Sequence, residues 1–195
     1  MRVPDSRGRD RDPYGRPRNS RPRDELGRPL PRDATFPSPG HAPSPAGSGP
    51  EVLEGAGGTI GPGEAADLGG TLLIEGRPFH AHEVFEDAWK SADESDRDLW
   101  RGLAQVAVGL THARRGNARG AVALLGRGAG NLRRYAARAG SPALGAGCLS
   151  FGVDATFVAS AADELATRIE RDGLAAVAAQ ALLLRLRPPQ QDDVS

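Results

Sequence analysis

Apolar residues recur every three or four positions from about residue 64 to about residue 187, the spacing that places them on one face of an α-helix. No convincing alternation of apolar and polar residues indicates a β-strand. The pattern therefore predicts an all-α fold, a compact helical bundle of about six helices. We expect these helices at 64–75, at 78–91, at 97–115, after the turn at 116–117, at 154–171 and at 174–187.

Glycine, proline and capping residues mark where these helices begin and end. Gly76 is expected to end the first helix, and Pro78 suits the first turn of the second. Asp96 is placed to cap the third helix. The Gly116–Asn117 pair leaves so short a connection that the third and fourth helices are predicted to form an antiparallel hairpin.

The same spacing predicts which side chains form the core. Leu68 lies on the apolar side of the first helix, and Leu103 and Leu124 lie mid-helix in the predicted hairpin. Changing Leu103 or Leu124 to Ala is expected to destabilise the fold by about 2–5 kcal/mol, because truncation leaves a cavity.

The N-terminal third of the chain differs in composition from the rest. It holds most of the prolines and few large apolar residues, so it buries too little surface to offset its ordering entropy. We therefore predict a disordered tail and linker over 1–63, a helical domain over 64–187 and a short tail over 188–195. Over residues 1–35, ten arginines face six acidic residues. This segment is either a solvated tail or an arm that contacts an acidic surface such as nucleic acid, and its interleaved aspartates weaken the second interpretation.

Overall composition limits the protein class and its cofactors. The formal net charge is zero, which gives no global argument for nucleic acid. Cys148 is the single cysteine, so neither an internal disulfide nor a cysteine-based zinc site is expected. The absence of a signal peptide and of a long apolar run predicts a cytoplasmic protein without a membrane partner. No phosphate loop or dinucleotide fingerprint is present, so neither a nucleotide nor a flavin cofactor is expected.

The segment GRPFHAHEVFEDAWK concentrates the candidate chemistry. His82 and Glu86 are four residues apart and Trp89 three further on, so all three follow one side of the second predicted helix. On a helical wheel His82 borders the apolar face and Glu86 lies just beyond it. We expect His82, Glu86 and Trp89 to face the interior and to meet Gln105 and His112 of the third helix.

Three interpretations of the His82–Glu86 pair stay open. The two side chains can be hydrogen-bonded partners at the edge of the core, since a buried polar group needs a partner. They can instead bind a divalent metal such as zinc, manganese or iron, with His112 as the third ligand and Trp89 and Gln105 lining the site. The third interpretation is acid–base chemistry without a metal, for which histidine is suited near neutral pH.

Residues 64–137 resemble a bacterial and archaeal protein family, the domain of unknown function 309. The family pattern His-x-x-x-Glu-x-x-Trp/Tyr matches His82, Glu86 and Trp89, and an Arg-Gly-Asn turn with a Gly-Ala step matches 115–117 and 120–121. The resemblance implies an all-helical fold and a metal-binding motif, and it implies no defined activity or substrate.

Two function classes follow from these observations. One is a helical domain with a small polar or metal site, and an enzyme would belong to this class. The other is a helical-hairpin interaction module with neither metal nor catalysis, because the Gly-Asn turn and its helix pair are similar to tetratricopeptide hairpins. Convergence of His82, Glu86 and His112 would favour the first class, and an exposed groove with these residues scattered would favour the second.

Overall fold

The computed structural model describes residues 60–139 and 149–189, and helices dominate this part of the chain. The predicted all-α class is confirmed. The tail predicted before residue 60 and the last six residues lie outside the described residues. The elements are, in chain order, α1 (Pro62–Ile74), α2 (Pro78–Ser91), α3 (Arg97–Arg114), α4 (Ala118–Arg138), β1 (Leu149–Ser150), β2 (Val153–Asp154), α5 (Ala155–Asp172) and two short 3-10 helices, η1 (Leu174–Ala176) and η2 (Ala179–Leu182).

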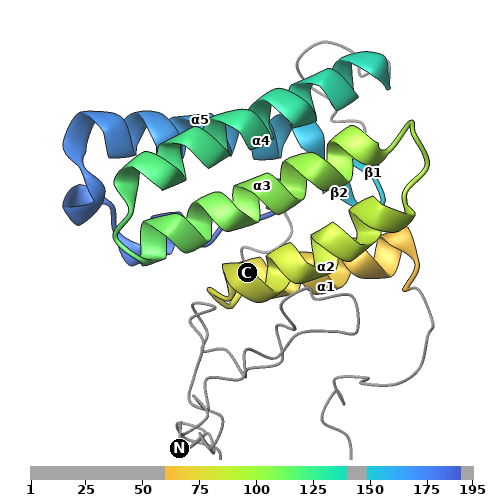
Figure 1. The fold of residues 1–195 in the computed structure, drawn as a ribbon, viewed down its shortest axis with the longest axis horizontal. Coiled ribbons are helices and arrows are strands. Elements are labelled where there is room, and N and C mark those ends of the chain that lie inside the picture. Colours follow the sequence, from red (N-terminus) through yellow and green to blue (C-terminus); the bar gives the residue numbers. More distant parts are fainter. Residues whose placement is uncertain (1–59, 140–148, 190–195) are drawn as a thin grey trace, which may run out of the picture. The chain divides into compact units, whose positions relative to one another are not determined.

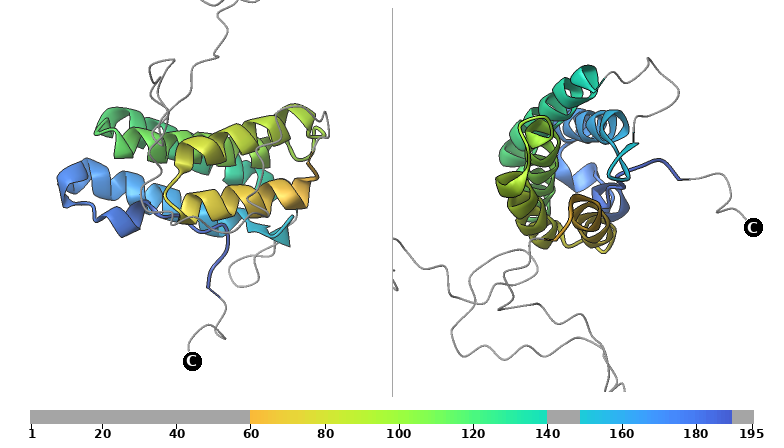
Figure 2. Two further views of the ribbon diagram at one scale, coloured as in Figure 1. Left: turned by 90° about the horizontal axis from the view of Figure 1, so that it is seen from below. Right: turned by 90° about the vertical axis from the view of Figure 1, so that its right-hand side faces the viewer.

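Each α-helix packs mainly against its neighbours in the sequence, so α3 lies between α2 and α4, and α4 between α3 and α5 (Figures 1 and 2). The α3–α4 pair is the predicted antiparallel hairpin. Asn117 begins α4 as its N-cap, because its Oδ1 accepts a hydrogen bond from the Gly120 N–H at 2.9 Å. Asp96 precedes α3 without capping it, and its carboxylate instead accepts from the Tyr135 hydroxyl at 3.3 Å.

The α3–α4 interface depends on close backbone approach. A Cβ at Gly102 would lie 2.7 Å from Leu132 Cγ, and one at Gly128 would lie 2.9 Å from the Gly102 carbonyl oxygen. Gly109 meets Leu125 in the same way, at 2.9 Å from its Cγ. Glycine at these three positions lets the two helices pack backbone against backbone.

The core confirms part of the predicted set and corrects the rest. Leu103 of α3 is 1% exposed, as predicted. In α4, however, the fully buried leucine is Leu125, whereas Leu124 is only partly buried and lies outside the core cluster. Leu68 of α1 is 45% exposed, so its assignment to the core was also wrong. In both α1 and α4 the predicted buried face is rotated about the helix axis from the observed one. The packing of neighbouring elements determines which edge of the apolar face is covered.

The predicted helix over 174–187 is replaced by η1, η2 and an irregular segment. In this segment Leu184 and Leu186 are buried while Arg185 and Arg187 are exposed, an alternation that requires extended chain. Leu186 covers Gly70 of α1, and its carbonyl accepts a hydrogen bond from the Asp154 N–H at 2.8 Å. Residues 184–186 thereby cover the core between α1 and β2.

A short antiparallel β1–β2 hairpin, which the sequence did not predict, precedes α5. Its two loop residues, Phe151 and Gly152, have φ angles of 53° and 80°. Phe151 is held in this unusual conformation by stacking on the buried Trp100, with ring centroids 5.8 Å apart. No helix within the described residues is long and apolar enough to cross a membrane.

Candidate functional site

Helix α2 brings the first two motif residues together. Ala81 and Phe85 are fully buried and fix the rotation of the helix, which leaves His82 and Glu86 at the edge of the buried face. His82 Nε2 lies 3.3 Å from Glu86 Oε2. The side chains are 25% and 40% exposed, so the predicted buried cluster is in fact a partly solvated pair.

The environment of His82 favours its neutral form. Burial lowers the pKa of His82 below its ordinary value of 6.5, although the Glu86 carboxylate and an interaction with the Ala104 backbone act in the opposite direction. Its Nδ1 is buried and forms no hydrogen bond of normal geometry with any residue that the structure describes. The pair is therefore a neutral imidazole beside a carboxylate near pH 7.

The two α3 residues predicted to join this pair have other partners. His112 lies at the end of α3, where its Nδ1 is 2.8 Å from Asn117 Nδ2 in the turn before α4. Gln105 accepts a hydrogen bond at 2.8 Å from the buried Asn131 of α4. His112 thus supports the α3–α4 turn, and Gln105 satisfies a buried amide between α3 and α4.

A metal site is not supported by this arrangement. Among residues 60–139 and 149–189, no three His, Cys, Asp or Glu side chains are gathered so that they could hold a metal ion. His82 and Glu86 supply two donors close together, and the structure does not bring His112 to them. The donor set therefore falls short of the three or four protein ligands that a zinc site normally uses.

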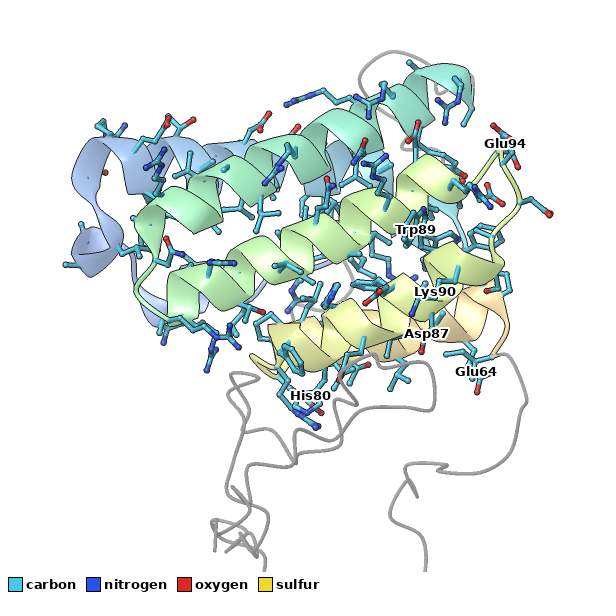
Figure 3. All side chains as sticks on the ribbon, viewed as in Figure 1. Glu64, His80, Asp87, Trp89, Lys90 and Glu94 are labelled. Atoms are coloured by element: carbon cyan, nitrogen blue, oxygen red, sulfur yellow. The ribbon has the colours of Figure 1, made fainter. Side chains whose placement is uncertain are left out.

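Trp89 corrects another prediction, because it does not face the interior. It is 36% exposed and lies on the edge of α2 next to α3, with Asp87 and Lys90 beside it on α2 and Glu94 in the following loop (Figure 3). It lines a pocket of about 470 Å³. The other residues of this pocket come from the α2–α3 loop, α3 and the end of α4: Glu94, Ser95, Arg97, Asp98, Arg101 and Arg138. Trp100, by contrast, is buried in the core.

The Trp89 pocket combines an indole with uncompensated positive charge. Asp98 is already paired with Arg138, at 2.7 Å, and with Arg134, at 3.8 Å. Arg97 and Arg101 are exposed, and neither forms an ion pair with another described residue. Glu94 also lines the pocket, so its three arginines and two carboxylates leave a formal charge of +1 beside the aromatic ring.

The pocket opens onto a helical hairpin of strongly basic composition. Residues 97–138, which form α3, the turn and α4, contain nine arginines and one acidic residue, a formal charge of +8. Residues 60–96 contain nine acidic and two basic residues, a formal charge of −7. The zero net charge of the chain hides this division, which counting charge separately for each predicted helix pair would have revealed.

Comparison with known proteins supports the family resemblance. Residues 67–124 match the family described as "Domain of unknown function (DUF309)". The chain is similar to this family from α1 into α4, over a stretch that includes His82, Glu86, Trp89 and Arg101. This match confirms the resemblance to the family. No curated protein and no solved structure matches the chain significantly.

Proposed function

We propose that the helical domain is a binding module for an anionic partner, with the outer surface of the α3–α4 hairpin as the binding face. The observation that carries this proposal is the separation of charge, because the hairpin holds nine arginines and one acidic residue. All nine arginines are exposed. Folding does not require exposed charges of one sign to gather, since like charges repel, whereas a polyanionic partner benefits from them.

The Trp89 pocket is the proposed point of closest contact. Arg97 and Arg101 are four residues apart, so they lie on the same side of α3. Guanidinium groups bind phosphate and carboxylate groups with paired hydrogen bonds, and the neighbouring indole offers a flat surface for stacking. In this proposal Trp89 contacts the bound partner.

Titration of the full chain with inorganic polyphosphate, followed by the fluorescence of Trp89, tests this proposal. The double variant Arg97→Gln/Arg101→Gln should weaken binding by about tenfold or more, since each charged hydrogen bond contributes roughly 1.5–3 kcal/mol. The matched control is Arg168→Gln/Arg171→Gln. It removes two exposed positive charges from α5, outside the proposed face, and it should bind almost normally. Equal weakening in both variants would contradict a specific face.

A divalent metal at His82 and Glu86 is the second candidate, and the 3.3 Å approach of their side chains favours it. Water or a second molecule would have to supply the remaining ligands. Elemental analysis of untagged protein, purified without chelator, should then detect stoichiometric zinc, manganese or iron that is lost in His82→Ala. Equal metal content in the wild type and the variant would rule out this pair as the site.

A further inference from the structure

The outward face of α4 has a simple composition that goes beyond the pocket. Its exposed arginines extend from Arg119 to Arg138, a rise of about 28 Å along the helix axis. The residues between them on this face are alanines and glycines: Ala123, Gly126, Gly130 and Ala137. No acidic side chain occurs in α4. α4 itself therefore presents no acidic group to a linear polyanion, although Glu170 of α5 lines a pocket with Arg119 and Ala123.

Part of this charge is free for a partner. Arg133 pairs with Asp163 of α5, whereas Arg127 contacts only the backbone oxygen of Ala123. Arg119 forms no ion pair within residues 60–139 and 149–189. Arg97 and Arg101 line the Trp89 pocket, and Arg119 and Arg127 add exposed positive charge along α4.

An anionic membrane fits this face less well than a nucleic acid does. Helices that lie on membranes insert large apolar side chains between the lipids. The large apolar side chains of α4, such as Leu125 and Leu132, are fully buried in the core. The surface thus has the charge to contact lipid headgroups, but the large apolar side chains of α4 are buried or, at Val122 and Leu124, only partly exposed.

Trp89 distinguishes single-stranded from double-stranded nucleic acid. Proteins that bind single strands combine a basic track for the phosphates with aromatic side chains on which bases stack. Trp89 supplies an exposed ring in the pocket that Arg97, Arg101 and Arg138 also line. In a duplex the faces of the bases are stacked on one another and are not available to an indole.

We infer that the partner is a single-stranded nucleic acid, with its phosphates along the exposed arginines of α3 and α4 and a base stacked on Trp89. This inference rests on the proposed anionic-partner function and gives that partner a chemical class. The stacking interaction makes it separable from binding by charge alone.

The test compares two probes on the full chain, an oligo(dT) of about 16 nucleotides and inorganic polyphosphate of similar charge. Trp100 is 1% exposed, so in the wild type fluorescence quenching by oligo(dT) reports on Trp89, and isothermal titration calorimetry compares the affinities of all variants, including those that lack this fluorophore. Oligo(dT) should bind more tightly than polyphosphate. Trp89→Ala should weaken oligo(dT) binding by about 5- to 150-fold and leave polyphosphate binding unchanged, because a stacked base contributes about 1–3 kcal/mol. Trp89→Phe retains an aromatic ring and should keep most of the affinity.

Salt dependence tests the path along α4. For single strands the slope of log K against log salt is about −0.7 for each phosphate contact, so Arg119→Gln/Arg127→Gln should reduce the slope by about 1.4. The control Arg168→Gln/Arg171→Gln removes two exposed charges from α5, outside this path, and should leave the slope unchanged.

The outcomes separate the two proposals. If polyphosphate binds at Arg97 and Arg101 but oligo(dT) binds no more tightly, or if Trp89→Ala has no effect, the nucleic-acid inference fails and the anionic module stands. If neither probe binds, both fail. Binding of phosphatidylserine vesicles without oligo(dT), or self-association that Arg119→Gln/Arg127→Gln abolishes, would assign this face to a membrane or to the acidic half of a second copy. Either result would overturn the inference.

Discussion

The first two helices and the α3–α4 hairpin both pack closely through glycines, but their surfaces carry opposite charge. In both regions glycine brings elements close: a Cβ at Gly69 would lie 2.1 Å from Phe85 Cε1, and one at Gly128 would lie 2.7 Å from Val106 Cγ2. Outside, residues 60–96 have a formal charge of −7 and residues 97–138 one of +8. Interior composition follows from folding, while surface charge can change at little cost in stability. The two regions therefore differ in the charge of their surfaces rather than in how their helices pack.

The largest expected effect separates core from surface within the hairpin. Leu125→Ala should destabilise the protein by about 2–5 kcal/mol, because it opens a cavity where the side chain is fully buried. The adjacent Leu124→Ala removes a side chain that is only partly buried and should cost less than about 1 kcal/mol. Urea unfolding of both variants measures the difference. The reverse order would mean that α4 is rotated from the position described here.

The next effect tests the close approach of α3 and α4. Gly128→Ala should destabilise by about 1–3 kcal/mol despite the better helix propensity of alanine, since its Cβ would meet the Gly102 carbonyl oxygen at 2.9 Å. Gly126 has nothing within 4 Å of such a Cβ, so Gly126→Ala should stabilise by roughly 0.5–1 kcal/mol. Thermal melting of the pair provides the measurement. Stabilisation by both changes would show that the helices can separate without loss.

A smaller effect concerns the acidic half and depends on pH. The pKa of His82 is lowered from 6.5, so below pH 6.5 the unfolded chain binds a proton more readily than the folded protein. The stability that neutral His82 contributes is complete above pH 6.5 and is lost as pH falls towards its folded-state pKa. The advantage of wild type over His82→Gln should therefore shrink between about pH 7.5 and pH 5.5. An advantage that grows on acidification would mean that Glu86, rather than burial, controls the pKa of His82.

The smallest expected effect sharpens the comparison of the two surfaces. Arg119→Gln/Arg127→Gln should change the free energy of unfolding by less than about 0.5 kcal/mol per substitution, as expected for exposed side chains without ion pairs. Chemical denaturation measures this, with Arg133→Gln as the control that breaks an exposed pair to Asp163. A large loss of stability would assign these arginines to the fold and remove the argument that they serve a partner.

Local signals predicted much of the secondary structure. The second helix was expected over 78–91 and α2 is Pro78–Ser91, and the third was expected over 97–115 and α3 is Arg97–Arg114. A proline in a first turn and the Gly116–Asn117 turn each depend on only a few neighbouring residues. Helix ends of this kind can therefore be recognised from the sequence alone. The segment after Gly173 was misassigned because its alternating Leu and Arg residues, such as Leu184 and Arg185, were not recognised as extended chain.

The candidate site was predictable only in part. The i, i+4 spacing of His82 and Glu86 is a property of any α-helix, and the pair does form, at 3.3 Å. Contacts between helices do not follow from the spacing of residues along one helix. His112 contacts the α3–α4 turn, Gln105 is hydrogen-bonded to α4, and Trp89 lies at the surface.

The sequence by itself thus determined the helices α1 to α5, the α3–α4 hairpin, the His82–Glu86 pair and the charge of each helix pair, because these depend on residues close together in the chain. Only the tertiary structure decided that Leu125 rather than Leu124 fills the core and that Leu186 closes it. It also decided that Trp89 lines a pocket with Arg101. A side chain at the border of an apolar face is buried or exposed according to the element that packs beside it, and that element can come from anywhere in the chain.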